Sequence, residues 1–124
     1  MATDTPQQVL NAIVVGINSG NIEALMSLYE PDAGFAQQPG TMVHGPTGVR
    51  DSLAAFIAMK GTLDIKVTRV LEAGGLALVA GVWSFTGTGP DGKPVTLAGR
   101  NADVLRRQTD GSWRFVIDHP WGTD

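Results

Sequence analysis

The chain of 124 residues contains no cysteine and only two histidines, His44 and His119. The absence of cysteine excludes disulfides, thiolate catalysis and metal sites built on thiolates. The two histidines stand far apart in the sequence and do not have the spacing of a metal site. We therefore expect no bound metal and no other cofactor, and any catalysis would be cofactor-independent acid/base chemistry.

Charged residues are also scarce. They make up 17% of the chain, against roughly 25% in ordinary globular proteins. The 9 basic and 12 acidic residues give a net charge of −3, and no basic run occurs, which argues against a nucleic-acid partner. With so few charged residues, a small domain has more apolar surface than it needs for its core. This apolar surface predicts an internal pocket, a subunit interface, or both.

Long hydrophobic runs are missing as well. The longest strongly apolar stretch, residues 76–83, is far too short to span a bilayer. The first ten residues have neither the basic nor the apolar segment of a signal peptide. We expect a single domain over residues 1–124, located in the cytoplasm and without a membrane partner.

The residues that are present predict helices in the first half of the chain. A helix is expected over residues 6–17, because apolar residues recur there at helical spacing. Thr5 is its expected N-cap, and Gln8 completes a capping box with it.

Two further helices are expected. A short second helix is capped by Asn21 and stops at Glu30–Pro31, so that Tyr29 lies on it. A third helix runs from residue 46 or 47 to residue 60, and Gly61 is its expected C-terminal cap.

After the third helix the hydrophobic period changes from about 3.6 residues to 2, which indicates strands. The alternation begins at Leu63 and slips near Arg69–Val70, where a β-bulge is expected. Further strands are expected over residues 76–86, 94–107 and 113–121, separated by glycine-containing turns. Three helices packed on one face of an antiparallel meander define an α+β fold. Such a sheet, when strongly curved, leaves a cavity beneath the helices.

This order of elements and three stretches of sequence resemble the nuclear transport factor 2-like superfamily. Residues 20–33, GNIEALMSLYEPDA, resemble the family segment GDxEALxxLYxxDA. Residues 44–50, HGPTGVR, are similar to the family motif xGxxxIR at the start of the third helix, and residues 103–119 resemble the closing hairpin. The resemblance implies a cone-shaped α+β fold with an internal pocket, shared by ketosteroid isomerases and SnoaL-like cyclases. It is specific for fold and weak for activity, because this fold hosts many chemistries.

For the isomerases, the resemblance implies a carboxylate base, a tyrosine and a protonated aspartic acid, the last two forming an oxyanion hole. The aspartic acid corresponds to Asp103. The base falls on Gln37, or on Gln38 with a one-residue slip, and an amide is not a base. The tyrosine falls near Ile13, whereas the only tyrosine of the chain is Tyr29. The usual steroid isomerase chemistry is therefore not expected.

Two aspartates are the candidate catalytic residues. Asp103 lies in the middle of a predicted strand, where a charged residue is disfavoured. It either faces solvent, a partner or an arginine, or it is an acid at the floor of the pocket whose pKa is raised by burial. Asp118 either pairs with an arginine or forms with Asp103 a carboxylate pair with one member protonated.

The orientation of the last strand decides between these alternatives. Alternation places the odd-numbered residues from Trp113 to Trp121 on one face, and Arg114, Val116 and Asp118 on the other. The resemblance suggests that the Asp118 row faces the pocket and the other row a subunit interface, unless a bulge exchanges the faces.

A related activity of this fold is epoxide hydrolysis, for which the resemblance requires Arg-x-Asp along one strand. Here Arg100 and Asp103 are three positions apart, which puts them on opposite faces. A water-activating pair of Asp103 and Asp118 stays open.

The expected pocket is apolar with a few convergent polar groups, which suits a small apolar or partly polar ligand. Each lining residue has an ordinary core role as its alternative. The ligand-binding candidates are Tyr29, Phe35, Gln37, Met42, Phe56, Trp83, Phe85, Asn101 and His119.

Three hypotheses of function follow. The first is an acid/base enzyme of the isomerase, cyclase or hydrolase type that uses Asp103 and Asp118. The second is a non-catalytic ligand-binding domain, which the missing base and tyrosine favour. The third is an association domain that forms a homodimer through its sheet, as in the kinase association domains that this fold resembles. Homodimerisation is compatible with the first two, and the low charge favours it.

Overall fold

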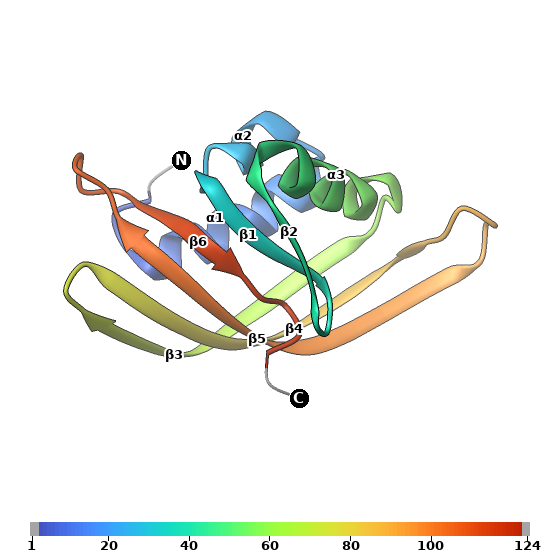
Figure 1. Cartoon of the computed structure of the whole chain (residues 1–124). Coiled ribbons are helices and arrows are strands. Elements are labelled where there is room, and N and C mark those ends of the chain that lie inside the picture. The colour runs from blue at the N-terminus through green and yellow to red at the C-terminus, as the bar shows by residue number, and fades with distance from the viewer. Residues whose placement is uncertain (1–2, 123–124) are drawn as a thin grey trace.

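The structure, a computed structural model, describes residues 3–122, and its helices lie on one face of a sheet (Figure 1). In this part of the chain the helices are α1 (Pro6–Ser19), α2 (Ile22–Met26) and α3 (Gly45–Ala58). The strands are β1 (Tyr29–Gln38), β2 (Thr41–His44), β3 (Thr62–Ala73), β4 (Leu76–Thr88), β5 (Pro94–Arg107) and β6 (Trp113–Asp118). The predicted α+β class is confirmed.

The sheet is mixed rather than antiparallel throughout. Its strand order is β2-β1-β6-β5-β4-β3. β1 and β6 run parallel, whereas the other neighbouring pairs are antiparallel. The expected antiparallel meander is correct for β3 to β6. The sheet is extended by β1, which joins it beside the last strand.

The β1–β2 hairpin is the element that the sequence pattern did not define. Glu30–Pro31 was expected to stop the second helix, but α2 already ends at Met26. Tyr29 opens β1, so its expected place on the second helix is wrong. Pro31 has no N–H for a sheet hydrogen bond, and the register of β1 against β6 shifts between Tyr29 and Gly34.

The first helix begins as predicted. The backbone N–H of Gln8 donates to Oγ1 of Thr5, and the backbone N–H of Thr5 donates to Oε1 of Gln8, each over 3.2 Å. This capping box satisfies N–H groups that the first turn leaves free. The apolar stripe of α1 is buried against the sheet. None of the helices described for residues 3–122 is long and apolar enough to cross a membrane.

The end of α3 differs from the expectation. Met59, not Gly61, is the C-cap, and the left-handed residue is Lys60 with φ 48°. Gly61 is instead required by a close approach, because a Cβ there would lie 2.0 Å from the backbone oxygen of Thr86. Its lack of a side chain lets the end of α3 pass next to β4.

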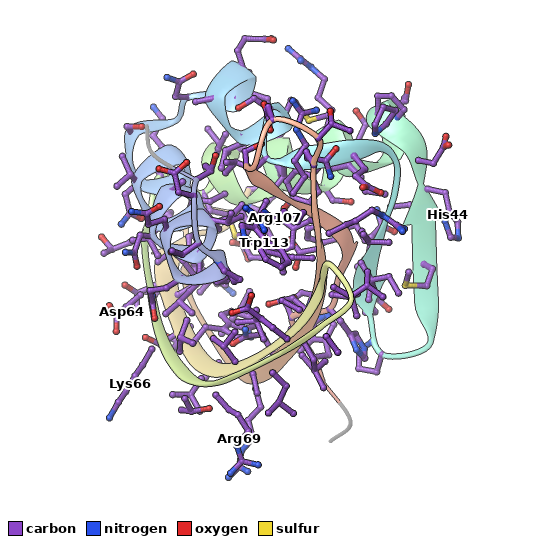
Figure 2. All side chains as sticks on the ribbon, turned by 90° about the vertical axis from the view of Figure 1, so that its left-hand side faces the viewer. His44, Asp64, Lys66, Arg69, Arg107 and Trp113 are labelled. Carbon is purple, nitrogen blue, oxygen red and sulfur yellow. The ribbon has the colours of Figure 1, made fainter. Side chains whose placement is uncertain are left out.

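The β-bulge expected near Arg69 is confirmed. The register of β3 against β4 shifts between Val67 and Arg69 and leaves Thr68 as the extra residue. Lys66 and Arg69 therefore both project outward, although they are an odd number of positions apart (Figure 2).

The inner face of the sheet carries the core. Along β4, alternate residues from Ala77 to Phe85 are buried on this face. Trp113 at the start of β6 is also buried and points to the interior (Figure 2). The helices α1 and α3 contact β3 and β1, so the space above the middle of the sheet is enclosed from both sides.

Candidate functional site

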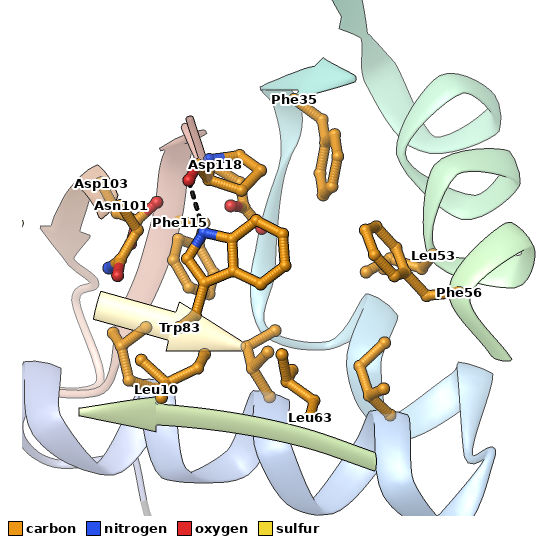
Figure 3. Close-up of a pocket in the computed structure, with 14 residues that line it drawn as sticks. Leu10, Phe35, Leu53, Phe56, Leu63, Trp83, Asn101, Asp103, Phe115 and Asp118 are labelled. Carbon is orange, nitrogen blue, oxygen red and sulfur yellow. Dashed lines mark hydrogen bonds between the residues drawn. The ribbon is translucent and has the colours of Figure 1, made fainter. Parts of the chain in front are cut away.

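A pocket lies between the inner face of the sheet and helices α1 and α3 (Figure 3). Its volume is about 60 Å³. The wall is mostly apolar, and its polar side chains come from β5 and β6. The lining residues are Leu10, Ile13, Ile17, Phe35, Leu53, Phe56, Leu63, Ile65, Trp83, Asn101, Asp103, Phe115, Asp118 and Pro120.

The register of β5 and β6 brings Asp103 and Asp118 together. Val104 pairs with Ile117 in an antiparallel ladder. Continuing this register by one residue places Asp103 directly opposite Asp118. Side chains at directly opposite positions have Cβ atoms about 5 Å apart, so the two carboxyl groups are neighbours.

A β-bulge in β6 turns both Phe115 and Asp118 toward the pocket. Leu105 pairs with Phe115 and Val104 with the residue two further on, so Val116 is an extra residue in β6. Asp118 lines the pocket, which is the orientation that the resemblance suggests. Phe115 lines it too, although it belongs to the row expected at a subunit interface.

Asp103 is buried, with 1% of its surface exposed. Its Oδ1 accepts the backbone N–H of His119 and its Oδ2 accepts Nδ2–H of Asn101, each over 2.8 Å. The alternative in which Asp103 lies on a solvated strand face is therefore wrong.

Asp118 is half-buried, and its Oδ2 accepts the hydroxyl hydrogen of Tyr29 over 2.5 Å. Tyr29 is itself buried, and its ring stacks on Phe115 with centroids 4.9 Å apart. These contacts follow from the parallel pairing of β1 with β6. The partner of Asp118 is thus a tyrosine, where the sequence left an arginine open.

The apolar surroundings change the acidity of these groups. Burial raises the pKa of Asp118 to about 6, against the lowering effect of hydrogen bonds from Tyr29 and Asp103. Burial and the charge of Asp118 raise the pKa of Asp103 well above its usual range, although the N–H groups of His119 and Asn101 oppose this rise. Burial also raises the pKa of Tyr29, so its hydroxyl remains a donor.

Because the two carboxyl groups are neighbours, they titrate as a coupled pair, and both pKa values are raised. Asp103 has the more strongly raised pKa and is the member that favours the neutral acid, whereas Asp118 is the member that ionises more readily. A proton acceptor and a proton donor thus stand side by side in a mostly apolar pocket. This arrangement is suited to general acid–base chemistry.

Four of the nine ligand-binding candidates line the pocket: Phe35, Phe56, Trp83 and Asn101. Tyr29 contacts Asp118 instead of lining the pocket.

The remaining candidates lie elsewhere. Phe85 is fully buried in the core. Gln37 is exposed and its Nε2 donates to Oγ of Ser52 over 3.0 Å. Met42 is 41% exposed on the edge strand β2. His119 is half-buried and contributes its backbone N–H to Asp103.

The positions at which the isomerase pattern has its tyrosine and its base do not come together in one site. Ile13, where the pattern has a tyrosine, lines the pocket. Gln37 and Gln38, where it has the base, are exposed on β1. The carboxylate next to Asp103 comes from Asp118 on β6 instead.

The segment after β6 contributes Pro120 to the wall of the pocket, next to Trp83. Nε1–H of Trp83 donates to the backbone oxygen of Pro120 over 2.5 Å. Nε1–H of Trp121 donates to the backbone oxygen of Gln37 over 3.0 Å, and its ring meets Trp83 edge to face at 5.4 Å.

Sequence reasoning missed the pocket residues of α1, which are Leu10, Ile13 and Ile17. Their spacing of three and four marks a buried stripe, but that signal is the same for a core residue and for a pocket wall. It also missed the hydrogen bond between Tyr29 and Asp118, for which a single sequence carries no signal.

The histidines lie apart from each other. His44 is exposed at the N-terminus of α3, and Figure 2 shows it on the outside of the molecule. Within residues 3–122, no group of three or more His, Asp and Glu side chains is arranged to hold a metal ion.

The fold is that of the NTF2-like α+β proteins, and the site is a carboxyl pair in the pocket of that fold. The family model of the SnoaL-like domain matches residues 10–116. The chain therefore belongs to the SnoaL-like domain family. A comparison with curated proteins finds no match.

Solved structures share the fold at low sequence identity. A protein of Streptomyces avermitilis, provisionally named a dehydratase of the NTF2-like family, superposes with a TM-score of 0.75 at 21% identity, covering 91% of this chain and 90% of that one. A protein of Shewanella frigidimarina, provisionally named a ketosteroid isomerase, has a TM-score of 0.75 at 18% identity over 90% of each chain. A protein of Xanthomonas campestris, provisionally named a calcium/calmodulin-dependent protein kinase II association domain, has a TM-score of 0.73 at 24% identity over 89% and 79%.

Proposed function

We propose that the protein is an acid/base enzyme that acts on a small apolar or partly polar molecule. Asp118 is the proton acceptor and Asp103 the proton donor. The observation that carries this proposal is the placement of the two carboxyl groups on β5 and β6 side by side in a mostly apolar pocket, where both pKa values are raised. An acceptor with a pKa of about 6 is close to the value that suits a base at neutral pH.

The spacing of the pair supports proton transfer beside a carbonyl group. The oxygen of a ketone and its α-carbon are two bonds apart, so adjacent carboxyl groups can reach both. The α C–H bond breaks, its proton goes to Asp118, and the electron pair moves into the enolate. The enolate oxygen then accepts a hydrogen bond or the proton of Asp103.

The low polarity of the wall supports the same proposal. Apolar residues around the pair leave the charge of Asp118 poorly solvated, which strengthens its interaction with a bound acid or dipole. The substrate is small, because the cavity of about 60 Å³ is less than half the size of one that takes up benzene, about 150 Å³.

The names of two structural neighbours agree with this reaction class. One is provisionally named an isomerase and the other a dehydratase. Isomerisation and dehydration beside a carbonyl both begin with the removal of an α-proton, so the proposal concerns this shared first step.

The proposal is tested by hydrogen–deuterium exchange at the α-carbons of acetone, a ketone small enough for this cavity, in D₂O, followed by proton NMR. The wild type is expected to accelerate the exchange over buffer, and Asp118→Asn to lose about 100-fold or more of that acceleration. Asp64→Asn is the matched control, because Asp64 is exposed and projects outward from β3 (Figure 2).

Two results would contradict the proposal: no acceleration by the wild type, or full acceleration by Asp118→Asn. Binding of acetone without exchange would support the non-catalytic binding domain instead.

A second proposal concerns association through the sheet. An apolar row crosses the outer face, where Leu71 pairs with Leu78, Leu78 with Val104, and Val104 with Ile117. Leu71 is 55% and Leu78 is 45% exposed, which is unusual for large apolar side chains in one continuous row. We propose that a second copy of the chain covers this row in a homodimer.

Light scattering on the protein as it elutes from a size-exclusion column tests the homodimer. The wild type is expected to have the mass of two chains at micromolar concentration, and Leu78→Asp the mass of one. Val15→Asp is the control, because Val15 is 52% exposed on α1, away from the row. A monomeric wild type would overturn the proposal.

A further inference from the structure

The two carboxyl groups of the pocket have only uncharged hydrogen-bond donors beside them. Asp118 accepts from the hydroxyl of Tyr29. Asp103 accepts from the side-chain amide of Asn101 and from the backbone N–H of His119. Within residues 3–122, the part of the chain that the structure describes, no lysine, arginine or histidine lines the pocket. The wall therefore supplies hydrogen bonds to the carboxyl pair but no positive charge.

Proton transfer inside the pocket does not change this charge balance. In the proposed function Asp118 is ionised before the step, so the pocket then holds one net negative charge. When the α-proton of a neutral ketone moves to Asp118, the same charge appears on the enolate. A charge in apolar surroundings is unfavourable unless an opposite charge compensates it. With a neutral substrate, the negative charge stays uncompensated from the beginning of the step to its end.

A substrate with one positive charge removes this imbalance. An ammonium group on the substrate and the carboxylate of Asp118 sum to zero before the step. After the step Asp118 is neutral, and the ammonium and the enolate of the substrate again sum to zero. The N–H groups of an ammonium also donate to a carboxylate in charge-assisted hydrogen bonds, which are stronger than neutral ones. The apolar wall strengthens this attraction further, because it screens charges less than water does.

The wall also suits the body of such a cation. Four of the lining side chains are aromatic rings, from Phe35, Phe56, Trp83 and Phe115 (Figure 3). The face of an aromatic ring attracts an ammonium group, and its carbon atoms pack against an apolar body. The cavity of about 60 Å³ limits the ligand to a small molecule. The pocket thus combines acidic groups with an aromatic wall at the size of a small organic cation.

We infer that the pocket selects small protonated amines, and that the substrate is a small carbonyl compound that carries an ammonium group. The ammonium group pairs with the carboxylate of Asp118, and the apolar part of the molecule contacts the aromatic wall. The inference rests on the proposed function, because the role of Asp118 as proton acceptor is what places the negative charge in the pocket.

Two probes of equal size test the inference on the wild-type protein. Isopropylamine and 2-propanol have the same number of non-hydrogen atoms as acetone, and both donate hydrogen bonds. Only the amine is charged, and an alkyl ammonium keeps its charge up to about pH 10. Dissociation constants are measured at about pH 7.5 from the backbone amide shifts of the pocket residues in NMR titrations. The amine is expected to bind about 10-fold more tightly, as the difference between a charged and a neutral hydrogen bond implies. Equal affinities, or tighter binding of 2-propanol, would overturn the inference.

A matched pair of variants identifies the carboxylate. Asp118→Asn keeps the shape of the side chain and removes its charge, so the ratio of the two affinities should fall to about 1. Asp64→Asn removes the same charge from an exposed position on β3 and should keep the wild-type ratio. A preference for the amine that survives in Asp118→Asn, or that is lost equally in Asp64→Asn, would overturn the inference.

A second pH gives the same test without any variant. The titratable side chains that face Asp118 are Asp103 on β5 and Tyr29 on β1. Because the pKa of Asp118 is about 6, this carboxyl group is protonated at about pH 4.5 in the empty pocket. The preference of the wild type for the amine should therefore fall several-fold between about pH 7.5 and 4.5. An equal preference at both pH values would contradict the pairing with Asp118.

These measurements separate the two claims. If neither probe shifts the pocket residues, the small-molecule site itself is contradicted, and the proposed function fails with it. If both probes bind equally, the site stands and only the cationic ligand class is lost. If the amine is preferred while the exchange of acetone is not accelerated, the ligand class is supported and the enzymatic proposal is lost.

Discussion

The hydroxyl of Tyr29 donates to Oδ2 of Asp118 over 2.5 Å, although the two residues are 89 positions apart in the sequence. The contact exists because β1, which Tyr29 opens, runs parallel to β6 and beside it. Tyr29 does not line the pocket, so it does not touch a ligand there. Its role in this account is to position Asp118 and to favour the charged form of that carboxyl.

Replacing Tyr29 by Phe tests this role. The variant keeps the ring that stacks on Phe115 and removes the hydroxyl. Because the hydrogen bond lowers the pKa of Asp118, its loss should move that pKa above about 6. The midpoint of the pH dependence of α-proton exchange should rise with it. An unchanged midpoint would show that the hydroxyl does not act on Asp118.

The raised pKa values also predict how stability depends on pH. In the unfolded chain both aspartates have a pKa near 3.9. Their pKa values are higher in the folded state, so the folded state binds more protons above that pH. The stability from these groups is present in full below about pH 4 and, for Asp118, is lost as the pH rises through about 6.

Urea unfolding of the wild type and of Asp118→Asn at about pH 4.5 and 7.5 measures this effect. The variant should lose less stability between the two pH values, by about 2 kcal/mol. Asp64→Asn should follow the wild type, because Asp64 is exposed. Equal pH dependence in the wild type and Asp118→Asn would contradict the raised pKa.

Two substitutions of Asp103 separate its fold role from its chemistry. Asn resembles the neutral acid and retains an oxygen for the N–H of His119, so Asp103→Asn should change the unfolding free energy by less than about 1 kcal/mol. The acceleration of α-proton exchange should nevertheless fall at least about 10-fold. Asp103→Leu leaves the His119 N–H buried without an acceptor and should lower the unfolding free energy by about 1–3 kcal/mol. Retained exchange activity in Asp103→Asn would remove Asp103 from the mechanism.

Gly61 has no tolerance for a side chain in this fold. A Cβ there would lie 2.0 Å from the Thr86 backbone oxygen and 2.7 Å from the Phe85 ring. Gly61→Ala should therefore lower the unfolding free energy by about 1–3 kcal/mol or more. Ser84→Ala on the outer face of β4 should change it by less than about 0.5 kcal/mol. A wild-type denaturation midpoint for Gly61→Ala would contradict the close approach.

Elements with a local signal could be predicted from the sequence, and elements defined by distant pairing could not. The capping box at Thr5 fixes the start of α1, and β5 has the bounds expected from its turns. The parallel pairing of β1 with β6 joins residues far apart and leaves no periodic signal. Pro31 supported the wrong prediction that a helix continues to this residue, because a proline is as compatible with the end of a helix as with an irregular strand.

The residues of the candidate site also differ in whether the sequence carries a local signal for them. Asp103 could be singled out because an aspartate in a strand is unusual and because the family resemblance includes it. The side on which Asp118 lies depends on one extra residue, Val116, and strict alternation does not reveal a bulge. The tyrosine partner of Asp118 depends on side-chain packing, which no spacing in the sequence encodes.

The proposed function requires that at neutral pH Asp118 is ionised while Asp103 beside it keeps its proton. The most direct measurement is an NMR titration of the aspartate side-chain ¹³C carboxyl signals, with Asp103→Asn and Asp118→Asn used to assign them. We predict that the Asp118 signal titrates near pH 6 and that the Asp103 signal remains that of a protonated acid well above its usual range. Titration of both signals near the ordinary value of about 3.9 would contradict it.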